Sequence, residues 1–378
     1  MRNLLFNLIN RSMKNTFQRK ANFCLAGIAS FVSIIFFAGS GCNKNDSAPT
    51  TSPTTTRYDE VKLVADQSSA GAAQTDPSLV NPWGIAIGGS GAFWLSANGA
   101  GKSTIYDRTG ATLLAAITVP ATGAVTGGPT GVVFNNTTDF KIALTGETGK
   151  FIFATVQGTI AAWSSAGVAI TVADRSSANA AYTGLTMASD AGANFLYAAD
   201  FRNARIDVYD KSFALVSGKS FSDSSLPAGY APFNIRSLNG KIYVMYAKQN
   251  SAKTEEENGA GNGYIDVFNT NGTFSSRFAS QGSLNSPWGI TMAPSGFGLS
   301  QNTLLVGNFG DGHINAFAQD GTSLGPLKDS ANNAIAIDGL WDITFPVNGQ
   351  PAGDPNQLFF AAGSDEEQHG LFGYLKVH

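Results

Sequence analysis

Short apolar runs alternate with polar turns along residues 57–378, and the pattern repeats at intervals of roughly 50 residues. Each repeat opens on one kind of phrase, in which two extended or turn-forming residues precede Gly, Asn or Asp and then an apolar run. The six copies are Pro82-Trp83-Gly84-Ile85, Pro129-Thr130-Gly131-Val132, Tyr182-Thr183-Gly184-Leu185, Pro232-Phe233-Asn234-Ile235, Pro287-Trp288-Gly289-Ile290 and Leu340-Trp341-Asp342-Ile343. This spacing is typical of β-propeller blades, so the phrase predicts six blades.

The third repeat shows how one such unit would fold as a blade. Residues 184–188 are half apolar, residues 195–199 are fully apolar, and residues 205–209 alternate with a period of two. These patterns are typical of an inner strand, a strand buried on both faces and a strand with one wetter face. With residues 215–221 as the outer strand, the repeat predicts four antiparallel strands joined by short turns.

The two ends of the repeat array predict how the ring closes. The sixth repeat stops at its third strand, residues 371–377, and lacks an outer strand. Residues 58–65 have strand character and precede the first inner strand. Pairing them as the outer strand of the last blade would remove open sheet edges that invite aggregation. We therefore expect one all-β domain over residues 57–378, a six-bladed β-propeller of four-stranded antiparallel blades closed by the N-terminal strand.

Two of the phrases carry a resemblance to known proteins. The stretches Asn81-Pro82-Trp83-Gly84-Ile85-Ala86 and Ser286-Pro287-Trp288-Gly289-Ile290-Thr291 resemble NHL-type propeller repeats. Residues 76–84 resemble the opening of an uncharacterised family of bacterial exported propeller lipoproteins. The resemblance covers residues 57–378 and implies a six-bladed fold. NHL-like propellers include protein-binding modules, a peptide-processing lyase and sugar-lactone hydrolases, so the fold does not imply one activity.

The segment before the repeats has the pattern of a targeting signal. Basic residues precede an apolar stretch at residues 23–38, and Gly39-Ser40-Gly41-Cys42 resembles the lipobox of bacterial lipoproteins, with Gly39 where that pattern has Leu. We expect residues 1–41 to be a signal peptide, with translation starting at Met1 or Met13.

We further expect Cys42 to carry the lipid and residues 42–56, rich in Ser, Thr and Pro, to be a flexible linker. The protein would then be exported and anchored to a bacterial membrane at the cell envelope. An uncleaved transmembrane anchor and simple secretion are the alternatives.

Composition and charge narrow the partners and the chemistry. The formal net charge is −3 and 13% of the residues are charged, without a basic patch, so we do not expect nucleic acid as a partner. Of the two cysteines, Cys24 would leave with the signal peptide, so the mature chain would have no disulfide and no thiol nucleophile. The sequence has three histidines and no hydrolase motif. We expect a monomer whose partners, apart from the membrane, are an envelope protein or a glycan.

Candidate binding residues lie on the loops that enter the inner strands and on those that join second to third strands. Ligands of propellers usually meet this face, and here its residues are polar: Asn81, Tyr182, Asp200, Arg202, Asn285, Asp311, Asp338 and Asp365. The alternative for Asp200, Asp311 and Asp365 is turn chemistry, because loop carboxylates often cap backbone N–H groups.

Other polar and aromatic residues recur with the repeat. Trp83, Trp288 and Trp341 share one repeat position, which favours packing between blades, with a ligand platform as the alternative. Asp207 and Asp266 lie on predicted third strands, and we expect them to face solvent.

Two functions from different classes fit these patterns, with a purely structural component of the envelope as a further alternative. The first is an envelope-anchored binding scaffold that holds a protein or glycan on its polar loop face and needs no cofactor. The second is a calcium-dependent lactonase- or lyase-like enzyme with its site at the central channel, because Ca²⁺ takes carboxylate and amide oxygens. Its candidate ligands are Asn81, Asn234, Asn285, Asp338 and Asp342. We favour the scaffold, because the sequence shows no catalytic motif.

Overall fold

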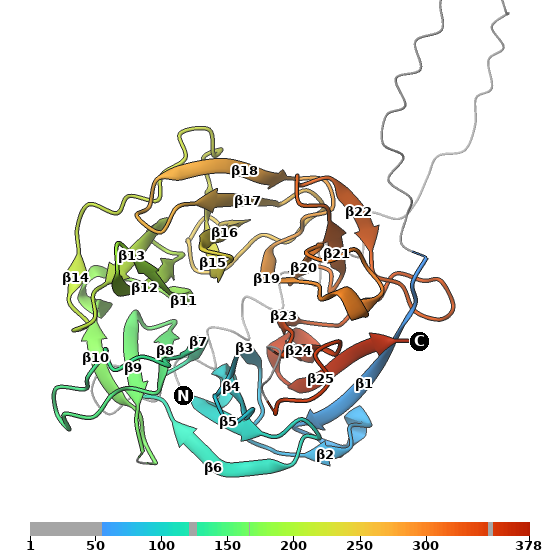
Figure 1. The fold of residues 1–378 in the computed structure, drawn as a ribbon, viewed down its shortest axis with the longest axis horizontal. Helices are drawn as coiled ribbons and strands as arrows, with labels where there is room; N and C mark the ends of the chain where they lie inside the picture. Colours follow the sequence, from blue (N-terminus) through green and yellow to red (C-terminus); the bar gives the residue numbers. More distant parts are fainter. Residues whose placement is uncertain (1–54, 121–126, 166, 347–350) are drawn as a thin grey trace, which may run out of the picture. The chain divides into compact units, whose positions relative to one another are not determined.

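Six small sheets stand side by side around a common axis in the computed structural model, which describes residues 55–120, 127–165, 167–346 and 351–378 (Figure 1). These residues belong to one compact unit, Thr51–His378. Each blade contains four antiparallel strands that follow one another outward from the axis, and the sheet of blade 6 has a fifth strand, paired parallel at its outer edge. The predicted six-bladed β-propeller is confirmed.

The blades have the following strands, from inner to outer. Blade 1 contains β3 (Pro82–Ile87), β4 (Phe93–Ala97), β5 (Lys102–Tyr106) and β6 (Thr112–Thr118), and blade 2 contains β7 (Pro129–Phe134), β8 (Phe151–Thr155), β9 (Thr159–Trp163) and β10 (Ile170–Asp174). Blade 3 contains β11 (Tyr182–Asp190), β12 (Ala193–Asp200), β13 (Arg205–Tyr209) and β14 (Leu215–Val216), and blade 4 contains β15 (Tyr230–Leu238), β16 (Lys241–Lys248), β17 (Gly263–Phe268) and β18 (Phe274–Ser280). Blade 5 contains β19 (Pro287–Met292), β20 (Leu304–Asn308), β21 (Ile314–Phe317) and β22 (Ser323–Pro326), and blade 6 contains β23 (Leu340–Thr344), β24 (Leu358–Ala362), β25 (Leu371–Val377) and β1 (Tyr58–Ala65), with β2 (Gln74–Thr75) outside β1.

Short helical turns lie in the connections: η1 (Ser68–Ala70), η2 (Asn98–Ala100), η3 (Ser176–Ala178), η4 (Ser295–Phe297) and α2 (Ser364–Glu367). In the part of the chain that the structure describes, no helix has the length and apolar character needed to cross a membrane.

The ring closes as predicted. β1 pairs antiparallel with β25, from Tyr58 opposite Val377 to Ala65 opposite Leu371. Figure 1 shows the blue β1 beside the red β25. The short strand β2 pairs in parallel with the outer edge of β1. The sequence pattern did not indicate this pairing. Because β1 and β25 belong to one sheet, blade 6 is complete only when both ends of the propeller domain are in place.

The outer strand of blade 3 is shorter than predicted. The pattern indicated residues 215–221, but β14 ends at Val216. Gly218 takes a φ of 91° and Phe221 a φ of 38°, which turns the chain away from the extended conformation. Phe221 is buried instead beside Tyr197 and Phe268, between blades 3 and 4.

Large apolar side chains fill the space between neighbouring blades. Between blades 6 and 1, Phe93 packs on Phe359 and Phe372, with ring centroids 4.3 and 5.4 Å apart. Between blades 2 and 3, Ile152 and Leu196 are fully buried in one cluster. Burying one such side chain stabilises the folded state by about 1.5–3 kcal/mol. Each blade therefore depends on both of its neighbours.

The inner strands approach one another at the Gly, Asn or Asp of the repeated phrase. A Cβ atom added to Gly84 would lie 2.7 Å from the carbonyl oxygen of Thr130, and one added to Gly131 would lie 2.3 Å from the nitrogen of Leu185. Two more glycines face the next inner strand in the same way, Gly184 and Gly289. A side chain at these positions would push neighbouring blades apart.

Blades 4 and 6 replace this glycine with a polar side chain that bonds to the next inner strand. Asn234 Nδ2 donates to the carbonyl oxygen of Trp288 at 2.8 Å. Asp342 Oδ2 accepts a hydrogen bond from the backbone N–H of Ile85 at 2.9 Å. All six phrases thus contact the following blade through one position, which explains why that position carries Gly, Asn or Asp.

Candidate functional site

An aromatic cluster occupies the axis at the end where the inner strands begin. Trp83 stacks on Trp341 with 3.6 Å between ring centroids, and Trp341 stacks on Phe309 with 4.0 Å between centroids. Trp288 and Phe233 approach Trp341 at 5.7 Å each. The five rings come from blades 1, 4, 5 and 6, and we call them the axial aromatic cluster. They fill the place where a central channel would open onto the loops.

The tryptophans of the repeated phrase are packing residues. Trp288 and Trp341 are 1% exposed and Trp83 is 7% exposed, so none of them offers a free ring face to a ligand. They pack against one another around the axis, and Trp83 also meets Trp288 from a non-adjacent blade at 6.3 Å. In blades 2 and 3 the same phrase position holds Thr130 and Thr183.

Two of the three indole N–H groups have partners within the ring. Trp288 Nε1 donates to the carbonyl oxygen of Thr183 at 3.0 Å, and Trp341 Nε1 donates to Asn81 Oδ1 at 3.0 Å. Trp83 Nε1 is buried and has no hydrogen-bond partner among the described residues. Acceptors in blade 3 and in the loop that enters blade 1 therefore fix the orientation of Trp288 and Trp341, and only packing orients Trp83.

Three residues of this region escaped the sequence analysis. Val156, Phe201 and Phe309 are each the first residue after a second strand; Phe309 belongs to the axial aromatic cluster, and Val156 and Phe201 pack on it. Phe309 and Val156 are half-buried, so they form the apolar centre of the loop face. An apolar residue at this repeat position, in an otherwise polar loop, was the signal that could have identified them.

Tyr182 and Asp200 were candidate ligand residues, and the structure buries both. The Tyr182 hydroxyl lies 2.7 Å from Asp207 Oδ2 and 2.6 Å from the Tyr209 hydroxyl, and burial raises the pKa of Tyr182. Asp200 accepts from a backbone N–H at 3.0 Å and from Asn203 Nδ2 at 2.7 Å, and burial raises its pKa as well. Asp200 therefore has the turn-capping role that was the alternative, and neither side chain reaches the surface.

Asn285 and Asp311 lie together beside blade 5. Asn285 Nδ2 donates to Asp311 Oδ2 at 3.2 Å, and Asn285 Oδ1 accepts from the backbone N–H of Gly259 at 2.7 Å. Asp311 Oδ1 accepts from the backbone N–H of His313 at 3.1 Å. The side chain of Asp311 is 31% exposed, so it belongs to the rim of the loop face and also caps its own turn.

Asn81, Asp338 and Asp365 lie near blade 6. Asn81 Nδ2 donates to Glu367 Oε2 at 2.9 Å, and the backbone N–H of Asp365 donates to Asp338 Oδ2 at 2.8 Å. Asp365 keeps 70% of its side chain exposed and lies 3.8 Å from His369 Nε2. This group forms a second, acidic part of the rim.

Arg202 follows Phe201 in the loop after β12. Its carbonyl and that of Phe201 accept hydrogen bonds from Gln249 Nε2 at 3.4 and 2.6 Å, which ties the loop to blade 4. Arg202 Nε is buried without a hydrogen-bond partner among the described residues, while the residue as a whole is half-buried. The loop after β12 thus carries a half-buried arginine directly after Phe201, which packs on the axial aromatic cluster.

The five candidate calcium ligands lie in separate networks. Asn234 and Asp342 bind neighbouring inner strands, and Asp342 also pairs with Arg236 Nη1 at 3.3 Å. Asn81, Asn285 and Asp338 bond to the loop groups described above. Over the described ranges, no group of three or more His, Cys, Asp or Glu side chains is placed to hold a metal ion.

Asp207 and Asp266 correct a prediction, because they are buried and do not face solvent. Asp207 Oδ1 pairs with Arg205 Nε at 2.9 Å, and Tyr182 from the inner strand covers Oδ2. Asp266 pairs with Arg277 of the neighbouring outer strand β18. In both blades an arginine, Arg205 or Arg277, pairs with a carboxylate that the period-two pattern had placed on the solvent-exposed face.

Comparisons with known proteins add relatives and neighbours in fold. No family model matches the chain. Uncharacterized protein R648 of Acanthamoeba polyphaga mimivirus is 35% identical over 326 residues, which cover 83% of this chain and 78% of that protein. Uncharacterized protein L690 of the same virus is 33% identical over 319 residues, which cover 80% of this chain and 82% of that protein.

Solved structures with the same fold include two enzymes. Virginiamycin B lyase from Staphylococcus aureus has a TM-score of 0.51 and 13% identity, over 85% of this chain and 99% of that one. The GH93 α-L-arabinofuranosidase of Fusarium graminearum has a TM-score of 0.52 and 9% identity, over 86% of this chain and 97% of that one. At such identities the likeness concerns the fold alone.

Proposed function

This chain belongs to the same family as the mimivirus proteins R648 and L690, and we propose that it is a non-catalytic binding module that holds a protein or glycan on the loop face of its propeller. The observation that carries the proposal is the axial aromatic cluster. Aromatic rings fill the level where a channel site would lie, and the carboxylates around them bond within the protein.

The layout of the loop face supports binding. Specific interfaces combine an apolar centre with a polar rim, and Arg and aromatic residues carry much of their affinity. Here Phe309 and Val156 form a half-buried apolar centre, Arg202 lies in a neighbouring loop, and Asp311 and Asp365 belong to the rim. Stacking on Trp341 keeps Phe309 in place, which lowers the entropy cost of binding.

The test is binding of the full chain to a printed array of glycans and purified envelope proteins. Arg202→Ala and Phe309→Ser change the loop face, and Leu215→Ser on the outer strand of blade 3 is a control at an exposed apolar residue. We expect both loop-face variants to weaken binding by about tenfold or more and the control to bind like the unchanged chain. Equal binding by all variants, or binding to none of the array, would contradict the proposal.

A calcium titration separates this proposal from the enzyme hypothesis. A binding module of this kind needs no metal, so we expect millimolar Ca²⁺ to change the melting temperature by less than about 1 °C. A rise of several degrees that Asp338→Ala abolishes would favour a calcium site on the loop face and contradict the proposal.

We also propose that the module is exported and held at a cell envelope through a lipid on Cys42, as in the bacterial propeller lipoproteins that its opening resembles. Residues 1–54 lie outside the described residues, so the support is the sequence before the propeller. Labelling with an alkynyl fatty acid in a bacterial host tests this. We expect label on the unchanged chain and on Cys24→Ser, and none on Cys42→Ser; label that Cys42→Ser retains would contradict the anchor.

A further inference from the structure

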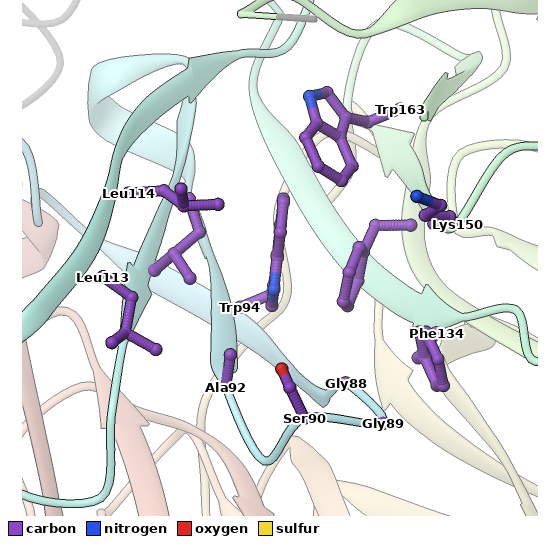
Figure 2. Close-up of a pocket in the computed structure, with 12 residues that line it drawn as sticks. Gly88, Gly89, Ser90, Ala92, Trp94, Leu113, Leu114, Phe134, Lys150 and Trp163 are labelled. Atoms are coloured by element: carbon purple, nitrogen blue, oxygen red, sulfur yellow. The ribbon is translucent and has the colours of Figure 1, made fainter. Parts of the chain in front are cut away.

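A pocket of about 440 Å³ opens between blades 1 and 2, away from the axial aromatic cluster. Figure 2 shows Trp94 in the middle, Leu113 and Leu114 on one side of it, and Phe134 and Lys150 on the other. The volume lies within the range of about 300–1,000 Å³ that small-molecule sites occupy. None of these residues belongs to the loop face, so the pocket is a separate feature of the molecule.

Packed aromatic rings form one wall of the pocket. Trp94 lies on Phe151 with 3.8 Å between centroids and 14° between planes, and Trp163 packs on Trp94 at 4.7 Å. Phe134 extends the row, 5.2 Å from Phe151. Trp94 and Phe151 are almost fully buried, whereas Trp163 and Phe134 are half-buried and offer apolar surface to a ligand.

A β-bulge brings two leucines to the mouth of this pocket. Ile105 pairs with Leu114 while Tyr106 pairs with Thr112, so Leu113 is an extra residue in β6. Both leucines line the pocket, and they are 49% and 47% exposed. Blade 4 has the same bulge and carries Ser275 and Ser276 there. The fold therefore does not require leucine at these positions, which indicates a role outside folding.

Lys150 supplies the charge of the pocket. Lys150 is the one ionisable residue among those that line the pocket. Its backbone N–H and carbonyl both form hydrogen bonds. Its N–H donates to the carbonyl oxygen of Trp163 at 2.7 Å, and its carbonyl accepts from the N–H of Asn135 at 2.8 Å. The ammonium group forms no ion pair within 4.0 Å in the described part of the chain. Its charge acts at longer range on Glu147, whose pKa is lowered by hydrogen bonds from Ser164 and Ser165 and in part by Lys150. A ligand with a single anionic group would therefore complement the charge of Lys150.

From this geometry we propose that the pocket binds an elongated apolar carboxylate. The apolar body lies against Leu113, Leu114 and the exposed surface of Trp163 and Phe134, and the carboxylate pairs with Lys150. Trp94 lies between the leucines and Lys150, so the ligand spans that distance with its apolar part. An uncharged apolar ligand would form no ion pair with Lys150, and a short anion would not cover Leu113 and Leu114.

The test measures binding of dodecanoate and of dodecanol, its uncharged counterpart, to the full chain by isothermal titration below the micellar concentration. Lys150→Met removes the charge and keeps the length of the side chain. Leu113→Ser with Leu114→Ser copies the bulge of blade 4. The matched controls are Lys141→Met and Leu215→Ser, which change exposed residues outside the pocket.

We expect Lys150→Met to weaken dodecanoate binding by about threefold to fivefold and to leave dodecanol binding unchanged, because an exposed ion pair contributes up to about 1 kcal/mol. The double serine variant should weaken both ligands, and the controls neither. The proposal is overturned if the unchanged chain binds neither ligand, or if the pocket variants bind like the controls. It is also overturned if sedimentation shows a dimer that the double serine variant dissociates, because a second copy would then cover the pocket.

Discussion

Asp342 in the last inner strand accepts a hydrogen bond from the backbone N–H of Ile85 in the first, at 2.9 Å. The two residues are 257 positions apart, so the contact joins the ends of the ring at the axis. Asp342 Oδ1 also accepts from the backbone N–H of Ile343 at 2.9 Å, and Arg236 pairs with the carboxylate. Burial raises the pKa of Asp342, whereas Arg236 and the backbone hydrogen bonds lower it.

Asp342→Ala should therefore be among the most destabilising single changes in the chain. It would leave Arg236 and a buried N–H without their partner, and losing one member of a buried pair costs about 3–5 kcal/mol. Asp320→Ala, in an exposed turn, should destabilise the protein far less. Urea unfolding of both variants measures the difference, and equal free energies of unfolding would show that the contact does not hold the ring.

Gly131→Ala tests the close approach of neighbouring inner strands. The added Cβ would lie 2.3 Å from the nitrogen of Leu185, which is backbone and cannot turn aside. We expect a loss of about 1–3 kcal/mol or more in the free energy of unfolding. Gly167→Ala is the matched control, because a Cβ there meets nothing within 4 Å. A loss no larger than that of the control would mean that the blades can separate freely at this point.

Trp83→Phe and Trp288→Phe remove the same kind of group from two rings of the axial aromatic cluster. The Trp83 N–H is buried without a partner among the described residues, whereas the Trp288 N–H donates to Thr183. Losing a satisfied buried hydrogen bond costs about 1–3 kcal/mol more than losing an unsatisfied donor. Trp288→Phe should therefore destabilise more than Trp83→Phe in chemical denaturation. The reverse order would contradict the hydrogen-bond assignment of the cluster.

The buried pair of Asp266 and Arg277 predicts a pH dependence of stability. Burial raises the pKa of Asp266 to about 6, although Arg277 lowers it in part. Because the folded-state pKa lies above the usual 3.8, the folded chain retains a proton that the unfolded chain releases, and stability falls as the pH rises from about 4 to about 6.

Asp266→Asn replaces the titratable carboxyl with an uncharged amide, so the variant lacks this pH dependence. Relative to that variant, the unchanged chain should lose about 2–3 kcal/mol in free energy of unfolding between about pH 4 and pH 7. Urea titrations of both proteins across this range give the result. A difference that stays constant with pH would show that Asp266 remains ionised throughout.

The local pattern along the chain was enough for the six blades and for the closure, although not for the outer strand of blade 3 or for β2. Residues 58–65 and 371–377 were predicted as partners because their alternation and their place at the two ends leave one economical pairing, and the structure has both with those bounds. The burial of Asp207 and Asp266 was missed, because it depends on arginines and aromatic groups that reach over the strand from elsewhere in the fold.

The candidate site was less predictable than the fold. Asn81 and Asp338 were identified as residues of the loops that enter the inner strands, but their partners Glu367 and Asp365 could not be predicted from the repeat spacing. Phe309 was missed because its importance arises only where blades converge on the axis. Whether the loop face binds a ligand stays a prediction.

The closed ring is the claim on which the whole account depends, and removal of β1 tests it most directly. Four residues of this strand, Tyr58, Leu63, Val64 and Ala65, are buried against the rest of the propeller. Calorimetry of chains that begin at residue 57 and at residue 67 compares the ring with and without its closing strand. We expect the longer chain to melt like the full protein and the shorter one to melt at least about 10 °C lower or not to fold. Equal melting temperatures would contradict closure by β1.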